Sequence, residues 1–165
     1  MAICLVRIDD RLIHGQVVMG WTKMLNASVI VVVDDVVAAD TMQKTMMKAA
    51  VPIGVRSAIL DVAEGAALLN GPKLTKDRVF VIVKGPAAVL GLINAGVNIK
   101  KIIVGNMRTD DGKKRITKEV AASKEEWECF GKLDSKGVEI VVQWMPNGDS
   151  KSFNDILKRG DFSSL

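Results

Sequence analysis

The sequence contains one histidine, His14, and only two cysteines, Cys4 and Cys129, which lie far apart in the chain. Protein zinc sites need closely spaced histidine and cysteine ligands, so this composition predicts no metal site. Cys4 falls in an apolar run typical of a buried strand, which favours two reduced thiols over a disulfide. A serine hydrolase is also disfavoured, because no motif marks a serine that His14 would activate.

Aromatic residues make up only 4% of the chain, and tyrosine is absent. The formal net charge is +4, but no aromatic side chains are interleaved with the basic residues to stack on bases. Nucleic-acid binding is therefore a weak alternative, and we expect no nucleic-acid partner. The sequence has neither a Walker A loop nor a G-x-G-x-x-G fingerprint, and we predict no cofactor.

Long hydrophobic runs are missing too, since none approaches the roughly 18 to 20 residues that a transmembrane helix needs. The N-terminal segment is not typical of a signal peptide, because charged residues interrupt it between Arg7 and Arg11. We therefore expect a cytoplasmic protein. The length of 165 residues and the lack of a linker-like stretch predict one domain over residues 1–165.

Short apolar runs alternate with helical patterns up to about residue 143. This alternation predicts an α/β fold: a single open, largely parallel, twisted sheet of about six or seven strands, with helices on both faces. Strands are expected at residues 3–8, 29–33, 52–55, 79–83, 102–104, 115–117 and 138–142. Helices are expected at about 15–25, 39–49, 57–69, 86–95, 124–136 and 153–157, with the methionines of the second in the core.

The loop after the first predicted strand combines the residue types that handle phosphate. Ligands of an open α/β sheet bind beyond the carboxyl ends of its strands. A neutral imidazole nitrogen of His14 is a competent nucleophile for a phosphoryl group, and Arg11 would neutralise the charge of that group. Asp9 or Asp10 would orient the imidazole, and the residues do not decide between them. The alternative is that Arg11 and one of these aspartates form only an exposed ion pair, contributing under about 1 kcal/mol.

Backbone N–H groups at the start of the following helix would cradle the phosphoryl oxygens. The groups are those of Ile13, Gly15 and Gln16, and Gly15 would allow a close approach because it has no Cβ.

Other predicted strands also end in charged residues, which are candidates for further contacts with phosphate or with a partner. For Asp34 and Asp35 the alternative is a role as turn or helix-cap residues. The candidates are Asp34, Asp35, Lys84 and Arg108.

The segment from Arg7 to Val17, RIDDRLIHGQV, closely resembles the active-site signature of the IIB components of the mannose/fructose/sorbose family of the bacterial sugar phosphotransferase system. The resemblance continues at residues 33–38, 103–107 and 136–139, and so covers nearly the whole chain. It implies a protein-histidine phosphotransferase in which His14 is phosphorylated on Nδ1. Arg11 and the backbone after it match the phosphate-cradling loop of the family.

The same resemblance implies the partners of the protein. The donor would be a phosphorylated IIA protein on a separate polypeptide, and the acceptor a sugar crossing the membrane through the IIC and IID components. The protein would associate peripherally with the inner face of the cell membrane through these partners. Sugar recognition belongs to the membrane components in this family, which agrees with the lack of an aromatic platform beside His14. The protein could also associate with further copies of itself as a homo-oligomer. The alternative to the phosphotransferase function is a non-catalytic phosphate-sensing or protein-interaction module on the same fold.

Overall fold

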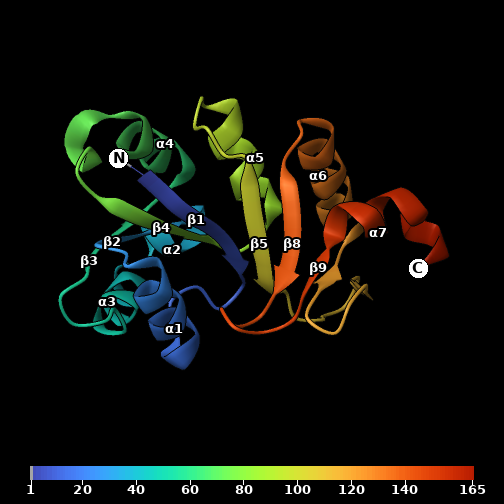
Figure 1. Ribbon diagram of the computed structural model, residues 1–165, viewed down its shortest axis with the longest axis horizontal. Helices are drawn as coiled ribbons and strands as arrows, with labels where there is room; N and C mark the ends of the chain where they lie inside the picture. Colours follow the sequence, from blue (N-terminus) through green and yellow to red (C-terminus); the bar gives the residue numbers. More distant parts are fainter. Residues whose placement is uncertain (1) are drawn as a thin grey trace.

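Seven strands form one sheet in the order β3-β2-β4-β1-β5-β8-β9 in the computed structural model, which describes residues 2–165 (Figure 1). Neighbouring strands pair parallel, except that β9 runs antiparallel to β8. The predicted α/β fold with a largely parallel sheet is therefore confirmed. The strands are β1 (Ala2–Asp9), β2 (Val29–Val33), β3 (Arg56–Leu60), β4 (Arg78–Val83), β5 (Lys101–Asn106), β8 (Glu139–Gln143) and β9 (Ser150–Ser152).

β2 and β4 are apolar along nearly their whole length because helices cover both of their faces. All five residues of β2 are buried, and so are Val79 to Val83 in β4. A strand with a solvated face would instead alternate apolar and polar residues. The continuous apolar runs explain why these strands were predicted at nearly the observed positions.

Two core clusters show which helices cover each face of the sheet. On one face, α1 (Gly15–Leu25) packs Val18 and Trp21 against Ile30 and Phe80. On the opposite face, α4 (Val62–Asn70), α5 (Pro86–Asn94), α6 (Lys124–Ser135) and α7 (Phe153–Arg159) contribute Leu69, Leu92, Phe130 and Phe153. The sheet is therefore doubly wound.

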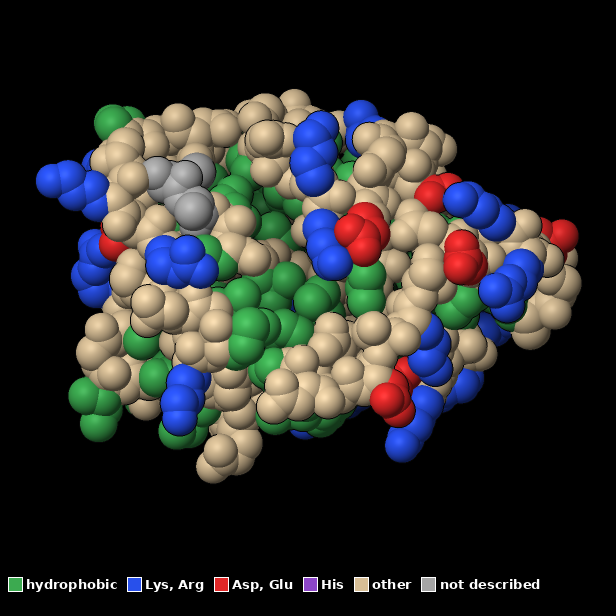
Figure 2. Space-filling model, viewed as in Figure 1, with side chains coloured by type: hydrophobic (Ala, Val, Ile, Leu, Met, Phe, Trp, Pro, Cys, Tyr) green, Lys and Arg blue, Asp and Glu red, His purple; other side chains and the backbone are tan. Residues whose placement is uncertain are grey.

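The helix cover is incomplete on the α1 side of the sheet. Figure 2 shows an apolar hollow on the face of the molecule turned to the viewer in Figure 1. The hollow has a volume of about 520 Å³ and is lined by β1, β5 and α1 side chains that include Leu5, Trp21, Met24 and Ile103. In the part of the chain that the structure describes, no helix is long and apolar enough to cross a membrane.

The prediction was wrong for residues 52–61, whereas the helix predicted after them is found from Val62 to Asn70. The segment expected as a strand forms a turn, in which Pro52 O accepts from Val55 N and Gly54 has a φ of +84°. Parallel pairing with β2 begins only at Arg56, so the first part of the predicted helix, residues 57–60, lies in β3 instead. The cap of α4 is Asp61, which forms a capping box with Glu64.

The methionines of the second predicted helix do not form core. That helix is α3 (Thr41–Ala49), which has no buried residue, and Met42 and Met46 are 73% and 65% exposed. Only Met47 packs against the core, because α3 lies at the edge of the layer beside α1. The preceding helix α2 (Asp35–Ala39), the strand β9 and the hairpin of β6 (Lys114–Arg115) with β7 (Ala121–Ala122) are only two to five residues long, too short for a periodic pattern, and only part of β6 was predicted as a strand.

Candidate active site

The carboxyl ends of β1 and β5 lie side by side, and the chain leaves them toward opposite faces of the sheet. β1 leads into α1 on one face, whereas the segment after β5 leads into α6 on the other. Such a divergence opens a crevice at the strand ends, where ligands of doubly wound folds bind. Asp9 ends β1, Asn106 ends β5, and His14 immediately precedes α1 at this edge.

The turn between β1 and α1 holds His14 in a defined position. Leu12 has a φ of 57°, a left-handed conformation that is strained for a residue with a branched side chain. Its N–H donates to Asp9 O at 2.9 Å, and its carbonyl oxygen lies 3.2 Å from His14 Nδ1. Because a carbonyl oxygen can only accept, this contact is a hydrogen bond when Nδ1 carries a proton.

Asp9 lies beneath this histidine and is almost completely buried, with 1% of its side chain exposed. Its carboxylate accepts from Arg11 N at 3.1 Å and from Arg7 Nη2 at 3.4 Å. Its Oδ2 also lies 3.9 Å from His14 Nε2, and its Oδ1 lies 3.7 Å from Arg11 Nε. Asp9 is therefore the carboxylate that faces the imidazole, and its contact with Arg11 is not the exposed pair considered from the sequence.

Asp10 has a different set of partners. Its carboxylate accepts from Asn106 Nδ2 at 2.9 Å, from the backbone N–H of Arg108 at 2.8 Å and from Arg108 Nε at 3.1 Å. These bonds join the loop after β1 to the loop after β5. Asp10 thus closes the crevice on one side. Arg108 lies beside the site because it binds the Asp10 carboxylate.

Arg7 is a charged residue inside the central strand, and its side chain is buried. The guanidinium donates to Gln143 O at 3.0 Å and lies 5.3 Å from the centre of the Trp21 ring. Burial lowers the pKa of Arg7 to about 10, while the charge of Asp9 opposes this shift, so Arg7 stays a cation at neutral pH. The guanidinium occupies the space where a Cβ of residue 105 would stand, which explains a glycine at that position of β5.

Arg11 lies above Asp9 with much of its hydrogen-bonding capacity unused. Its guanidinium stacks on the ring of Trp144, 5.1 Å from the ring centre, and its Nε and Nη2 are buried without a hydrogen-bond partner. Within residues 2–165, five buried side-chain nitrogen or oxygen atoms lack a partner, and four of them belong to Arg7, Arg11 and His14. Each such atom costs about 1 to 3 kcal/mol, so this cluster indicates a place where an anionic ligand adds hydrogen bonds.

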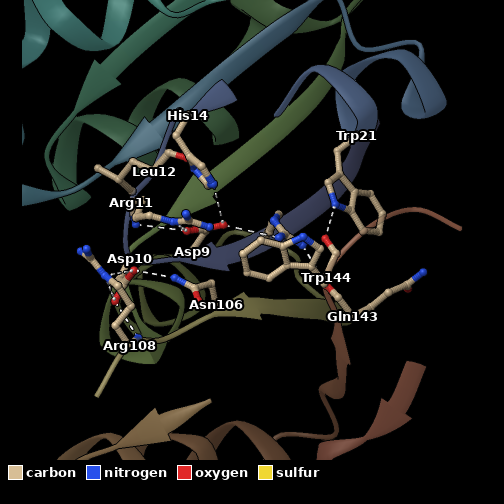
Figure 3. Close-up of polar contacts among 11 residues, drawn as sticks. Asp9, Asp10, Arg11, Leu12, His14, Trp21, Asn106, Arg108, Gln143 and Trp144 are labelled. Carbon is tan, nitrogen blue, oxygen red and sulfur yellow. Dashed lines mark hydrogen bonds and ion pairs between the residues drawn. The ribbon is translucent and has the colours of Figure 1, made fainter. Parts of the chain in front are cut away.

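Figure 3 shows these side chains converging from three segments of the chain. Asp9 and Arg11 come from the end of β1 and its turn, His14 points down toward Asp9, and Trp144 reaches the site from the segment after β8.

The first turn of α1 also has unused donors. His14 is its N-cap and makes no side-chain cap hydrogen bond, so N–H groups such as those of Gly15 and Gln16 have no partner within the helix. Gly15 has a φ of 40°, which favours glycine, and a Cβ built on it meets no atom within 4 Å. The predicted cradle is thus open at Gly15 and Gln16, whereas the Ile13 side chain is buried in the core. The phosphate contacts of all three stay predictions.

Three of the residues expected at other strand ends lie at a separate place. Asp34 Oδ1 accepts from Val37 N at 2.8 Å and caps α2, and Asp35 Oδ1 accepts from Val62 N at 2.9 Å. Lys84 lines a hollow of about 290 Å³ together with these two aspartates. The structure therefore gives both aspartates the cap-like contacts considered as the alternative, and it joins only Arg108 to the His14 site.

Sequence reasoning missed the residues that reach the site from β5 and β8. Trp144 lies against Arg11, so the expected lack of an aromatic platform near His14 was wrong. One signal was available: a charged Arg7 within an apolar strand needs a buried partner. The position of Trp144 just after a predicted strand also places it at the carboxyl edge of the sheet.

Neither thiol shares this edge with His14. Cys4 lies near the start of β1, at the opposite end of that strand, and Cys129 lies on α6. Neither forms a disulfide within the described residues 2–165, and burial raises the pKa of the Cys129 thiol, which disfavours its nucleophilic thiolate form. No group of three or more potential metal ligands occurs among the residues that the structure describes.

Comparison with known proteins gives a consistent set of relatives. Residues 3–164 match the family model described as "PTS system sorbose subfamily IIB component". The chain is 38% identical over 161 residues to the mannose-specific EIIAB component of Escherichia coli, covering 98% of this chain and 50% of that protein. The chain thus spans about half the length of this relative. It is 35% identical to the fructose-specific EIIB component of Bacillus subtilis, covering 96% of this chain and 97% of that one.

Solved structures agree with this match. The crystal structure of the IIBSor domain of the sorbose permease from Klebsiella pneumoniae superposes with a TM-score of 0.93 at 32% identity. The superposition covers 98% of this chain and 99% of that chain. The match therefore extends over the whole sheet and its helices.

Proposed function

The chain belongs to the sorbose subfamily of IIB components of the phosphotransferase system, and we propose that it carries a phosphoryl group on His14 from a IIA protein to a sugar. The observation that carries this proposal is the cluster of buried, unpartnered nitrogens on Arg7, Arg11 and His14 around one buried carboxylate. Positioning and electrostatics supply most of the catalysis of phosphoryl transfer, and this cluster offers both.

Nδ1 of His14 is the nitrogen that we propose for the attack. Nε2 faces the carboxylate of Asp9 at 3.9 Å, and the negative charge of Asp9 disfavours an anionic phosphoryl group on that nitrogen. Nδ1 must first give up its contact with the Leu12 carbonyl and lose its proton, while Nε2 becomes protonated. A small rotation of the ring would let Nε2–H donate to Asp9, which now lies 3.9 Å away.

The transfer then proceeds with a defined exchange of bonds. The lone pair of Nδ1 forms a bond to phosphorus while the bond between phosphorus and the donor breaks. The imidazole gains positive charge, which the carboxylate of Asp9 stabilises as in other oriented imidazoles. Arg11 donates its free N–H groups to the phosphoryl oxygens, together with the backbone of Gly15 and Gln16.

The second half-reaction returns His14 to its unphosphorylated form. A hydroxyl of the sugar attacks phosphorus and releases its proton to solvent, while the bond from Nδ1 to phosphorus breaks and its electron pair returns to Nδ1, with the ring proton left on Nε2. We propose that a sugar held by IIC and IID membrane components is the acceptor, which would place the protein at the inner face of the membrane. We also propose that residues 1–165 act as one phosphotransferase domain. The relatives are named for mannose, fructose and sorbose, and the fold by itself does not select among these sugars.

The test of this proposal is labelling with phosphoramidate, a small donor that phosphorylates histidine with loss of ammonia. We expect the wild-type chain to take up one phosphoryl group and His14→Gln to take up none, with both proteins folded by circular dichroism. Cys4→Ser and Cys129→Ser are the matched controls and should label like the wild type. Labelling that persists in His14→Gln, or that is lost in a cysteine variant, would overturn the assignment of the nucleophile.

A further inference from the structure

Trp144 contacts Arg11 through the face of its ring, and this contact differs from a hydrogen bond in one respect. The guanidinium carbon of Arg11 lies 5.1 Å from the ring centre, which is a cation–π distance. Stacking attracts the cation to the face of the ring, whereas the N–H groups of a guanidinium point outward in its own plane. The contact can therefore hold Arg11 without using the donors that a phosphoryl group needs.

The hydrogen bonds of Arg11 agree with this reading. Its Nε and Nη2 have no hydrogen-bond partner, and its closest carboxylate oxygen, on Asp9, is 3.7 Å from Nε. A carboxylate at hydrogen-bond distance would hold the guanidinium too, but it would occupy the donors and compete with the incoming anion. Arg7 is the contrast, since it also stacks on a tryptophan but donates to Gln143 O and lies 3.4 Å from Asp9.

The segment that carries Trp144 is fixed by three sets of hydrogen bonds. Arg7 Nη1 donates to Gln143 O at 3.0 Å, and Trp21 Nε1 donates to Trp144 O at 3.0 Å. The Gln143 side chain donates to the carbonyls of Met145 and Pro146 at 3.1 and 3.0 Å. Two consecutive carbonyls are thus anchored to β1 and α1, and the ring they support is held at the site although 38% of Trp144 is exposed (Figure 3).

We infer that Trp144 is a positioning residue for phosphoryl transfer: its ring holds the Arg11 guanidinium over the site while leaving the N–H groups of Arg11 free for the phosphoryl oxygens. This inference rests on the proposed function, because it assigns Trp144 a role in the same transfer. It requires that Trp144 act only through Arg11.

The contact itself is tested by ¹⁹F NMR of protein that contains 5-fluorotryptophan at its three tryptophan positions. Single Trp→Phe variants assign the resonances. We expect Arg11→Ala to shift the resonance of Trp144 and to leave that of Trp127, which packs against Phe153 and Phe162, unchanged. An unchanged Trp144 resonance would mean that the two side chains are not stacked in solution, and the inference would be wrong.

The role is tested by the rate of phosphoramidate labelling in a double-mutant cycle. We expect Trp144→Leu to slow labelling about 5- to 10-fold, and Trp144→Phe to restore most of the rate because a ring remains. In the Arg11→Ala background, Trp144→Leu should cause no further loss. Trp127→Phe is the matched control and should label like the wild type. A wild-type rate for Trp144→Leu, or an equal loss in both backgrounds, would exclude the positioning role.

Failure of the proposed function gives a different result. If the wild-type chain takes up no phosphoryl group, the proposed function is wrong, whatever the variants do. The same four proteins of the cycle are then compared for binding of inorganic phosphate. A loss of affinity in Trp144→Leu that disappears in the Arg11→Ala background supports the role of Trp144, and additive losses overturn it.

Discussion

Two strands of the same sheet end in the same pair of residues, and the two pairs have different surroundings. β1 ends in Asp9 and is followed by Asp10, and β2 is followed by Asp34 and Asp35. Asp34 and Asp35 accept hydrogen bonds from the backbone N–H groups of Val37 and Val62, as residues that cap helices do. Asp9 instead lies among two arginines and a histidine.

The difference arises from what surrounds each pair. At the end of β1, Arg7 is buried behind Asp9, and the left-handed Leu12 turns the chain so that His14 lies above it. At the end of β2 the chain enters a helix directly, and the carboxylates have N–H groups as their nearest partners. A strand-end aspartate pair therefore has no functional meaning by itself; the buried cation and the turn distinguish the candidate site from the structural one.

The largest difference between the ends of β1 and β2 is expected in the free energy of unfolding when a glycine that packs against each strand end is replaced by alanine. Gly105→Ala would place a Cβ inside the space of the Arg7 guanidinium and displace the buried pair with Asp9, lowering the free energy of unfolding by about 3 kcal/mol or more. Gly65→Ala would bring a Cβ to 2.8 Å from Cγ2 of the buried Val33, which must shift, but alanine also regains about 1 kcal/mol of helix propensity over glycine, so the net cost should be about 1 to 2 kcal/mol. Urea unfolding measures both, and an equal cost would contradict the importance of the buried arginine.

The sequence predicted the elements whose signals are local. The apolar runs of β2 and β4, the helix after His14 and the helix at residues 124–136 were all expected near their observed positions. Residues 52–60 were misjudged, because the parallel partner that decides where β3 begins is not visible in the local pattern.

In the candidate site too, the residues that are close in sequence were predicted and those that only the fold brings together were not. His14, Arg11 and Asp9 are neighbours in the chain, and the sequence brought them together. The bond from Arg7 to Gln143 joins residues 136 positions apart, and the bond from Trp21 to Trp144 joins residues 123 apart. Such contacts depend on the strand order β1-β5-β8, which the sequence did not provide.

The next largest effect concerns the rate of phosphorylation. Asp9→Asn keeps the shape of the side chain but removes the charge that stabilises the imidazolium, so phosphoramidate labelling of folded protein should slow by about 100-fold. Asp35→Asn is the matched control: an asparagine oxygen still accepts from Val62 N, and its labelling rate should equal that of the wild type. If both variants labelled at the same rate, the two aspartate pairs would not differ in function.

The smallest effect is expected for Asp34→Ala. Loss of the hydrogen bond to Val37 N removes the N-cap of α2 and should lower the free energy of unfolding by about 1 kcal/mol. Phosphoramidate labelling should stay at the wild-type rate, since Asp34 contacts the helix and not His14. Thermal unfolding and labelling of the same sample test this together, and slower labelling would show that the second pair also serves the transfer.

The most direct test of a phosphoryl group carried at the end of β1 is NMR of the phosphorylated, ¹⁵N-labelled protein. The chain has one histidine, so any phosphohistidine signal belongs to His14 without further assignment. We predict one ³¹P resonance coupled to a single imidazole nitrogen, Nδ1, with Nε2 protonated and facing Asp9. A phosphoryl group on a cysteine or an aspartate, or coupling to Nε2, would contradict the account.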